Sequence, residues 1–210
     1  MPAGEVAASA RHPPACSFLI EPASYVEPLD LEKIFSRRAP IQVDLGCGDG
    51  TFLLAMAKTF PEKNFLGVER LWGRTRSAST KATQVNNVRV LRMETSYAVR
   101  YMLAQASIEA FYLLFPDPWP KRRHQRRRVF TNEFLDAIQA ALTDGGTFLA
   151  VTDQKDYFIE MKRIAENSSG FESTQAREKS DLPISTFEKK FRDQGVPVYR
   201  LELRKTSPLT

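Results

Sequence analysis

The stretch IQVDLGCGDG, residues 41–50, decides the fold of this chain. Residues 41–45, of which Ile41, Val43 and Leu45 are apolar, lead into a loop that carries Gly46, Gly48 and Gly50, and helix-forming residues come next at 52–58. A strand that passes through a glycine loop into a helix is typical of a parallel sheet with helices on both faces. The stretch therefore predicts a doubly wound α/β domain.

The same order of strand and helix repeats along the chain. Apolar runs predict further strands at residues 64–68, 88–91, 108–115 and 147–151. Helical patterns lie between them, and the clearest one repeats apolar residues at every fourth position from Phe130 to Leu142. The last strand, residues 199–203, alternates apolar and charged side chains, so we expect it near an edge of the sheet. The polar segment 173–197 predicts a long loop.

Length and composition favour one domain. The 210 residues, 42% of them apolar, suffice for one well-packed core and not comfortably for two. We expect residues 1–17, rich in Ala, Pro and Ser, to be a flexible lead-in and residues 18–210 to form a single domain. No apolar run resembles a signal peptide or a membrane span, which predicts a cytoplasmic protein. Two Cys and two His residues predict neither a disulfide nor a metal site.

An acid precedes the glycine loop, and it bears on which ligand the loop suits. A dinucleotide fingerprint, GxGxxG, needs a glycine at position 51, where the chain has Thr51. Asp44 would repel a pyrophosphate, but it suits a ligand with a positive end, such as S-adenosylmethionine with its ammonium and sulfonium groups. A nicotinamide or nucleotide site remains an alternative, as does an ordinary turn between a strand and a helix.

Two further acids follow the next two predicted strands. Glu69 ends the second strand, 23 residues after Gly46, where a carboxylate can accept hydrogen bonds from both ribose hydroxyls. Glu94 follows the third strand, where it can meet the adenine edge. Because the carboxyl ends of parallel strands share one edge of a sheet, we expect Asp44, Glu69 and Glu94 to converge on one cofactor site.

A second motif, FPDPWPKRRHQRRR at residues 115–128, follows the fourth predicted strand. Asp117 lies between two prolines, which stiffen the turn and position its carboxylate. Trp119 follows the second proline. Six of the eight residues 121–128 are Lys or Arg, and without them the net charge of +5 would become −1. This concentration of positive charge predicts contact with a polyanion, most commonly a nucleic acid, beside a reaction site.

Together these motifs resemble the bacterial tRNA (guanine-N7-)-methyltransferase family. The resemblance rests on PDPWPK with its basic run, on VDLGCGDG and GVE, on Thr152 with Asp153, and on STFE at residues 185–188, and it covers about residues 40–205. It implies a Rossmann-like class I methyltransferase fold, which is an α/β domain with a seven-stranded, mostly parallel sheet, helices on both faces and an antiparallel last strand. It also implies S-adenosyl-L-methionine as cofactor, tRNA as partner and no obligatory protein partner.

The resemblance carries site residues over one by one. It implies a cofactor site of Asp44, Gly46, Gly48, Gly50, Glu69, Glu94 and Asp117, and a substrate site of Lys121, Asp153, Ser185, Thr186, Phe187 and Glu188. Two positions depart from the family pattern. The family usually has Glu where this chain has Asp44, and Lys where it has Thr186.

The activity that the resemblance implies is formation of N7-methylguanosine in the variable loop of tRNA. Guanine N7 carries a lone pair and no proton, so it can attack the sulfonium methyl directly, and the enzyme supplies proximity, alignment and charge stabilisation. We expect Asp117 to be the catalytic residue, accepting hydrogen bonds from guanine N1–H or the N2 amino group. The expected phosphate contacts are Arg122, Arg123, Arg126, Arg127 and Arg128. A methyltransferase of another RNA base or a small molecule, or an inactive RNA-binding protein on the same fold, are the alternatives.

Overall fold

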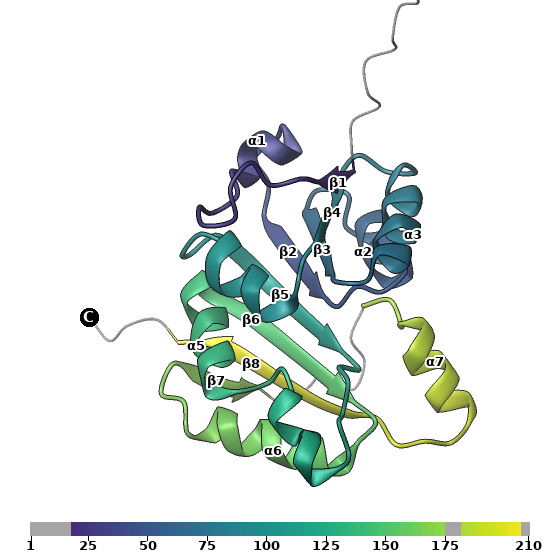
Figure 1. The fold of residues 1–210 in the computed structure, drawn as a ribbon, viewed down its shortest axis with the longest axis vertical. Coiled ribbons are helices and arrows are strands. Elements are labelled where there is room, and N and C mark those ends of the chain that lie inside the picture. The colour runs from purple at the N-terminus through teal and green to yellow at the C-terminus, as the bar shows by residue number, and fades with distance from the viewer. Residues whose placement is uncertain (1–17, 175–181, 207–210) are drawn as a thin grey trace, which may run out of the picture.

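A computed structural model describes residues 18–174 and 182–206 of the chain. Within these residues it shows an α/β fold built on an eight-stranded sheet with the order β1-β4-β3-β2-β5-β6-β8-β7 (Figure 1). The strands are β1 Leu19–Ile20, β2 Ile41–Leu45, β3 Asn64–Glu69, β4 Val88–Arg92, β5 Ile108–Leu114, β6 Leu142–Thr152, β7 Phe171–Thr174 and β8 Tyr199–Lys205. The helices are α1 Leu31–Phe35, α2 Thr51–Thr59, α3 Trp72–Ala82, α4 Thr95–Tyr97, α5 Asn132–Ala141, α6 Lys155–Glu166 and α7 Thr186–Asp193, with a π-helix Ala98–Met102 and a 3₁₀-helix Arg122–Arg127.

Strand directions confirm the predicted fold class. Strands β1 to β6 pair in parallel, whereas β8 runs antiparallel to both of its neighbours, β6 and β7. The chain leaves β2 toward β3 on one side and returns to β5 on the other, so the strand order reverses at β2. In a doubly wound sheet, this reversal opens a crevice at the carboxyl ends of the strands, where ligands bind.

Several details differ from the sequence predictions. Strand β7 was not predicted, and β6 begins at Leu142 instead of residue 147. The sheet has an eighth strand, because the two residues of β1 pair with Val90 and Leu91 of β4, and so short a strand carries no periodic signal. The predicted loop 173–197 is wrong where the structure has helix α7. Ser185 caps the start of this helix, because its hydroxyl accepts a hydrogen bond from the Glu188 backbone N–H at 3.2 Å. Strand β5 ends one residue early, because Phe115 has a φ of 51°.

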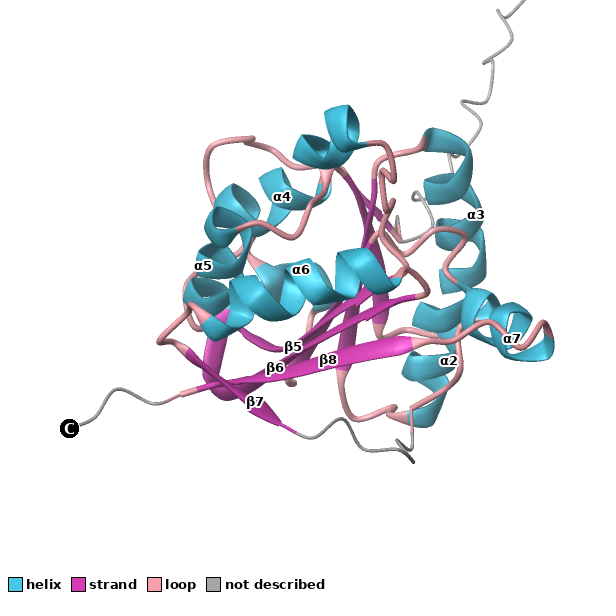
Figure 2. Cartoon of the chain, turned by 90° about the horizontal axis from the view of Figure 1, so that it is seen from below, coloured by secondary structure: helices cyan, strands magenta, loops and turns pink. Residues whose placement is uncertain are grey.

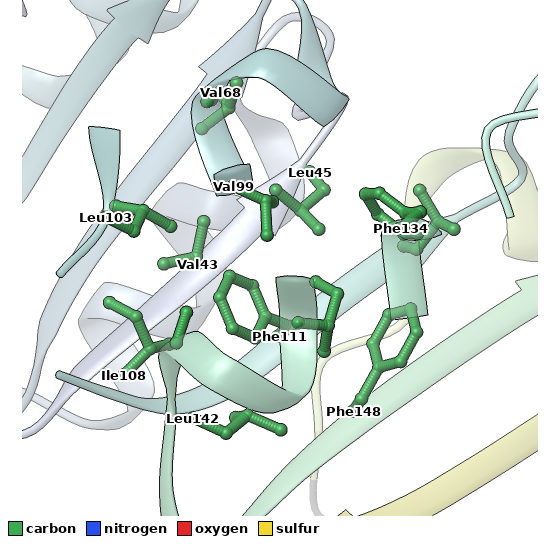
Figure 3. Packing of buried hydrophobic residues seen from close by; sticks show 14 of the residues in the cluster. Val43, Leu45, Val68, Val99, Leu103, Ile108, Phe111, Phe134, Leu142 and Phe148 are labelled. Atoms are coloured by element: carbon green, nitrogen blue, oxygen red, sulfur yellow. The ribbon is translucent and has the colours of Figure 1, made fainter. Parts of the chain in front are cut away.

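Helices cover both faces of the sheet, and the strands alternate between two apolar layers (Figure 2). Val43, Leu45 and Phe111 pack on one face with Val99 and with Phe134 of α5 (Figure 3), in a cluster that also includes residues of α6. On the other face, Ala110 and Tyr112 of β5 pack with α2 and α3. Helix α5 illustrates how the sequence produces this packing. The Thr131 hydroxyl caps its first turn, and its buried face consists of Phe134, Leu135, Ile138 and Ala141.

The predicted flexible lead-in, residues 1–17, lies outside the described residues. Among the residues that the structure describes, no helix is long and apolar enough to cross a membrane.

The start of α2 lies against α3 with no room for a side chain. Gly50 immediately precedes α2 and has a φ of +78°, which favours glycine. A Cβ built at Gly50 would lie 2.8 Å from the Cβ of Ala78, a buried residue of α3. The glycine loop is therefore fixed by helix packing on one side, while its other glycines face open space.

We expect Gly50→Ala to lower the free energy of unfolding by at least about 1–2 kcal/mol, because a left-handed φ costs an L-residue that much before the contact with Ala78 is counted. Urea unfolding measures this free energy. Gly73→Ala is the matched control, since a Cβ at Gly73 meets nothing within 4 Å, and it should be neutral or stabilise by roughly 0.5–1 kcal/mol. Equal free energies for the two variants would contradict the close approach of α2 and α3.

Candidate active site

A cavity of about 340 Å³ opens at the carboxyl edge of the sheet, at the strand-order reversal. Its walls come from the ends of four neighbouring strands and from the loops after them. They include Leu45, Gly46, Glu69, Arg70, Leu71, Arg74, Glu94, Thr95, Leu113, Leu114, Phe115, Pro116, Asp117, Trp119, Arg127 and Val129. The structure therefore brings together the acids expected after β3, β4 and β5.

The glycine loop presents bare backbone to this cavity. Gly46 and Gly48 have φ values of +78° and +56°, and a Cβ at either would meet no atom within 4 Å. The backbone N–H groups of Gly46 and Cys47 donate to the Val68 carbonyl at 2.8 and 3.0 Å, which ties the loop to β3. A ligand can therefore approach the main chain closely, as a glycine loop of this kind allows.

Glu69 is buried at the end of β3, and its carboxylate is held by backbone donors. One oxygen accepts the Gly48 N–H at 3.2 Å and the other accepts the Leu71 N–H at 2.7 Å. Each carboxylate oxygen can accept a second hydrogen bond. Glu69 therefore keeps acceptor capacity toward the cavity that it lines.

Asp44 is buried, with 4% of its surface exposed, and its carboxylate has no hydrogen-bond partner within residues 18–174 and 182–206. Burial, together with the nearby charge of Glu69, raises the pKa of Asp44 to about 7. Asp44 itself does not line the cavity, but the next two residues, Leu45 and Gly46, do. Two adjacent buried acids, one of them unpaired, fit the positive end of a ligand better than an anion.

Glu94 lies between β4 and α4, lines the cavity and is exposed. Its carboxylate caps α4 by accepting the Tyr97 N–H at 2.8 Å. This contact fixes the side chain at the cavity edge, where the sequence predicts an adenine contact.

The turn after β5 holds Asp117 in a strained backbone. Phe115 and Trp119, which bracket Pro116 to Pro118, have φ values of 51° and 42°, a region that side chains other than glycine rarely adopt. Asp117 is exposed, lines the cavity, and makes no hydrogen bond within the described part of the chain. Strain of this kind concentrates at functional sites, and it leaves a rigidly placed carboxylate available to a ligand.

Arg128 corrects one prediction for the basic segment. Its guanidinium is buried, donates to the Pro118 carbonyl at 2.8 Å and to Asp156 at 2.6 Å, and also pairs with Glu160. It further lies 4.5 Å from the centre of the Tyr157 ring. The phosphate contact predicted for Arg128 is therefore wrong, because its charge is neutralised and covered, and the residue ties the turn around Asp117 to α6.

The other arginines of the segment remain on the surface. Arg122, Arg123, Arg126 and Arg127 belong to the 3₁₀-helix, are exposed, and form no ion pair within the residues that the structure describes. The Arg127 guanidinium stacks on the Trp119 ring at 4.9 Å, and both residues line the cavity. Lys121, directly before this helix, is also exposed.

The segment 185–188 reaches the site through aromatic contacts. The Phe187 ring is 56% exposed and lies 6.3 Å from the Phe115 ring, and Phe191 lies 5.2 Å from it. Ser185 and Glu188 are buried, and Glu188 pairs with Arg192 and Arg200. Ser185 and Glu188 thus anchor α7 beside the turn.

Two more expected substrate residues differ in their surroundings. Thr186, directly after Ser185, is exposed at the start of α7. Asp153 comes directly after β6, is half-buried, and accepts a hydrogen bond from the Gln154 side-chain amide. Neither lines the cavity.

Sequence reasoning missed part of the cavity wall. The cavity is also lined by Arg70 and Leu71 of the β3–α3 connection and by Arg74 of α3, although no motif marks them. Their position directly after Glu69 was the available signal, since residues just beyond a strand end at a switch point border the crevice. No group of three or more His, Cys, Asp or Glu residues that could hold a metal ion occurs within residues 18–174 and 182–206.

Solved structures with similar folds define the class of protein. The chain superimposes on the 16S rRNA methyltransferase KamB with a TM-score of 0.62 at 17% identity, covering 86% of this chain and 95% of that one. An aminoglycoside resistance methyltransferase gives a TM-score of 0.61 at 18% identity, covering 84% of this chain and 92% of that one. The fold is that of a class I methyltransferase.

Sequence comparisons give the family. The family model described as putative methyltransferase matches residues 38–201. The tRNA (guanine-N(7)-)-methyltransferase of Nitrosococcus oceani is 32% identical over 85% of this chain and 77% of that protein. The Thermotoga maritima protein of the same name is 34% identical over 85% of this chain, which spans only 58% of that relative. The chain belongs to the tRNA (guanine-N(7)-)-methyltransferase family.

We expect Asp44 to make the stability of the ligand-free protein depend on pH. The pKa of Asp44 is about 7 in the folded protein, against an ordinary value of 3.8. Between these values the folded protein binds a proton that the unfolded protein has released, so the free energy of unfolding falls as pH rises toward 7. The Asp44→Asn variant lacks this dependence on pH. The free energy of unfolding of the variant minus that of wild type should rise by about 2–3 kcal/mol between pH 5 and pH 8. Urea unfolding of both proteins at the two pH values measures this, and a difference independent of pH would contradict the raised pKa.

We expect replacement of Arg128 and replacement of Arg126 to have different effects on the free energy of unfolding. Arg128→Gln should lower the free energy of unfolding by about 2–4 kcal/mol, because it removes one partner of a partly buried charge cluster and leaves the Pro118 carbonyl without its donor. Arg126→Gln, the matched control on the same segment, should change it by less than about 0.5 kcal/mol. Chemical denaturation measures both. A neutral Arg128→Gln would mean that Arg128 does not hold the turn.

Proposed function

We propose that this chain transfers a methyl group from S-adenosylmethionine to N7 of a guanosine in the variable loop of tRNA. The observation that carries this proposal is the unpaired buried carboxylate of Asp44, next to Glu69 and beneath an open glycine loop. Membership of the tRNA (guanine-N(7)-)-methyltransferase family supports the reaction and the substrate.

The cofactor site that we propose uses the acids at the strand ends. Asp44 would balance the ammonium group, with Gly46, Gly48 and Gly50 giving the backbone access that a bulky ligand needs. Glu69 would accept hydrogen bonds from ribose hydroxyls, since its oxygens keep spare acceptor capacity, and Glu94 would meet the adenine edge. S-adenosylmethionine supplies an electrophilic methyl group on a sulfonium, which the N7 lone pair can take directly while the C–S electrons return to sulfur.

Asp117 selects and orients the guanine in this proposal. Its exposed carboxylate makes no other hydrogen bond in the described part of the chain, so it can accept hydrogen bonds from guanine N1–H and the N2 amino group. Adenine lacks these donors and would leave the carboxylate unpaired. The negative charge of Asp117 also offsets the positive charge that develops on the ring as N7 gains the methyl group. No general base is needed, because N7 carries no proton.

The surfaces around Asp117 supply the remaining substrate contacts. Arg122, Arg123, Arg126 and Arg127 offer exposed guanidinium groups that suit RNA phosphates. In the same proposal, the substrate also contacts Lys121, Asp153, Thr186 and Phe187. Ser185 and Glu188 would act indirectly, by holding α7 near the turn.

Asp117→Asn tests the proposed reaction at its acceptor end. The amide presents an N–H₂ group to guanine donors, so we expect kcat/KM for tRNA methylation to fall about 10- to 150-fold, as for loss of a hydrogen bond worth roughly 1.5–3 kcal/mol. Unmodified tRNA, a donor with a labelled methyl group and identification of the modified nucleoside measure the product. Asp136→Asn on α5, also exposed, is the control.

Three outcomes separate the possibilities. Turnover by Asp117→Asn within a few-fold of wild type would contradict the role of Asp117. A wild-type product other than N7-methylguanosine would contradict the proposed reaction and favour another methyltransferase activity. Calorimetric titration of wild type with S-adenosylmethionine decides the cofactor, and absence of binding would favour an inactive RNA-binding protein.

A further inference from the structure

The chain has a second region with as many Lys and Arg residues as the segment 121–128. Residues 70–93 contain six Lys or Arg residues and no Asp or Glu. The six cations are scattered over 24 residues, so no run of basic letters reveals them. The sequence-based conclusion that the basicity is concentrated in one segment was therefore incomplete.

Four of these six cations are exposed arginines without an ionic partner. Arg70, Arg74, Arg76 and Arg92 are exposed, and their guanidinium groups make no ion pair or hydrogen bond within residues 18–174 and 182–206. The other two cations are engaged, because Lys81 pairs with Asp49 and Arg89 lies over the rings of Phe18 and Phe35. The positive charge of the four arginines is therefore not neutralised locally.

An exposed aromatic residue stands among these arginines. Trp72, at the start of α3, is 53% exposed, and the Arg92 guanidinium lies 5.3 Å from its ring centre. Trp72 and Arg76 are one helical turn apart, so they share a side of α3. Aromatic rings interleaved with cations are characteristic of surfaces that bind single-stranded or looped nucleic acid, where bases stack and phosphates are neutralised.

These residues lie on the opposite side of the cavity from the 3₁₀-helix. They come after β3 and at the end of β4, whereas the basic 3₁₀-helix comes after β5, and β3 and β5 flank β2 on its two sides (Figure 1). Arg70 and Arg74 line the same cavity as Trp119 and Arg127. A positively charged surface thus borders the cavity on each side.

We propose that Arg70, Trp72, Arg74, Arg76 and Arg92, which we name the β3–α3 surface, bind a second segment of the RNA whose target base enters the cavity. This inference rests on the proposed function and extends it. The guanidinium groups contact phosphates of that segment, and the Trp72 ring stacks against an unpaired base or ribose. The RNA is then held on both sides of the cavity.

The test uses the two outer arginines, because Arg70 and Arg74 border the cofactor site. In Arg76→Gln/Arg92→Gln, the slope of log K for tRNA binding against log salt should become shallower by up to about 1.4–1.8 units, the equivalent of two phosphate contacts. The same relation gives a loss of affinity of up to about 100-fold near 0.1 M salt. Affinity for S-adenosylmethionine and the melting temperature should stay at wild-type values.

The matched control removes the same charge from the opposite edge of the sheet. Lys58 and Arg163 are exposed and lie in the last turns of α2 and α6, and Lys58→Gln/Arg163→Gln should leave the salt slope unchanged. An equal slope for the control and the Arg76→Gln/Arg92→Gln variant would overturn the inference. A second variant, Trp72→Ala, should weaken tRNA binding about 5- to 150-fold with little change in slope; wild-type affinity would overturn the stacking role.

Substrate length separates this inference from the proposed function. With a short oligonucleotide centred on the target guanosine, the Arg76→Gln/Arg92→Gln variant should bind as wild type does, because the second segment is missing. An equal loss with tRNA and oligonucleotide would overturn contact with a second segment. If wild type methylates tRNA and the arginine variant keeps its slope, only the inference fails; if wild type neither binds nor methylates tRNA, the proposed function fails.

Discussion

The structure of the site depends on placing two carboxylates side by side in the interior. Asp44 and Glu69 lie near the carboxyl ends of neighbouring parallel strands and face the same side of the sheet, and the charge of Glu69 adds to burial in raising the pKa of Asp44. Glu69 is stabilised by backbone N–H groups, one of them from the glycine loop, whereas Asp44 has no such donor in the described part of the chain. The fold therefore carries a destabilising feature that a bound cation would relieve, which is the usual relation between stability and function at a binding site.

The turn that carries Asp117 is positioned from outside the cavity. Its left-handed residues, Phe115 and Trp119, are costly in isolation, so neighbouring elements must hold the conformation. Arg128 does so from the side of α6 through the Pro118 carbonyl, and Phe191 of α7 packs against Phe115 from the other end. A partly buried charge cluster and an aromatic contact thus fix a carboxylate that makes no hydrogen bond of its own in the described part of the chain.

Periodicity and strand ends could be predicted from the sequence, whereas features that depend on spatial neighbours could not. Strands β2 to β6 carry apolar runs, and the acids after them converge because parallel strands end at one edge. Strand β1 was missed because two residues have no period, and α7 because its sequence is mostly polar. Arg128 could not be told from Arg126 or Arg127, since only the turn of the 3₁₀-helix directs it toward Asp156 and Glu160. The arginines of the β3–α3 surface are too dispersed to form a motif.

The distribution of charge separates two ligands of opposite sign. Acids lie at and beneath the inner end of the cavity, where Asp44 and Glu69 are buried. The exposed arginines of the β3–α3 surface and of the 3₁₀-helix lie along the cavity walls and around them. A cationic cofactor is attracted inward, while a polyanion is attracted to the rim and repelled from the acids within. Asp117 stands at the boundary, so the RNA groups that can approach it favourably are neutral hydrogen-bond donors on a base rather than phosphates. In the function that we propose, the charge arrangement that keeps the RNA backbone at the rim therefore also directs a base toward Asp117.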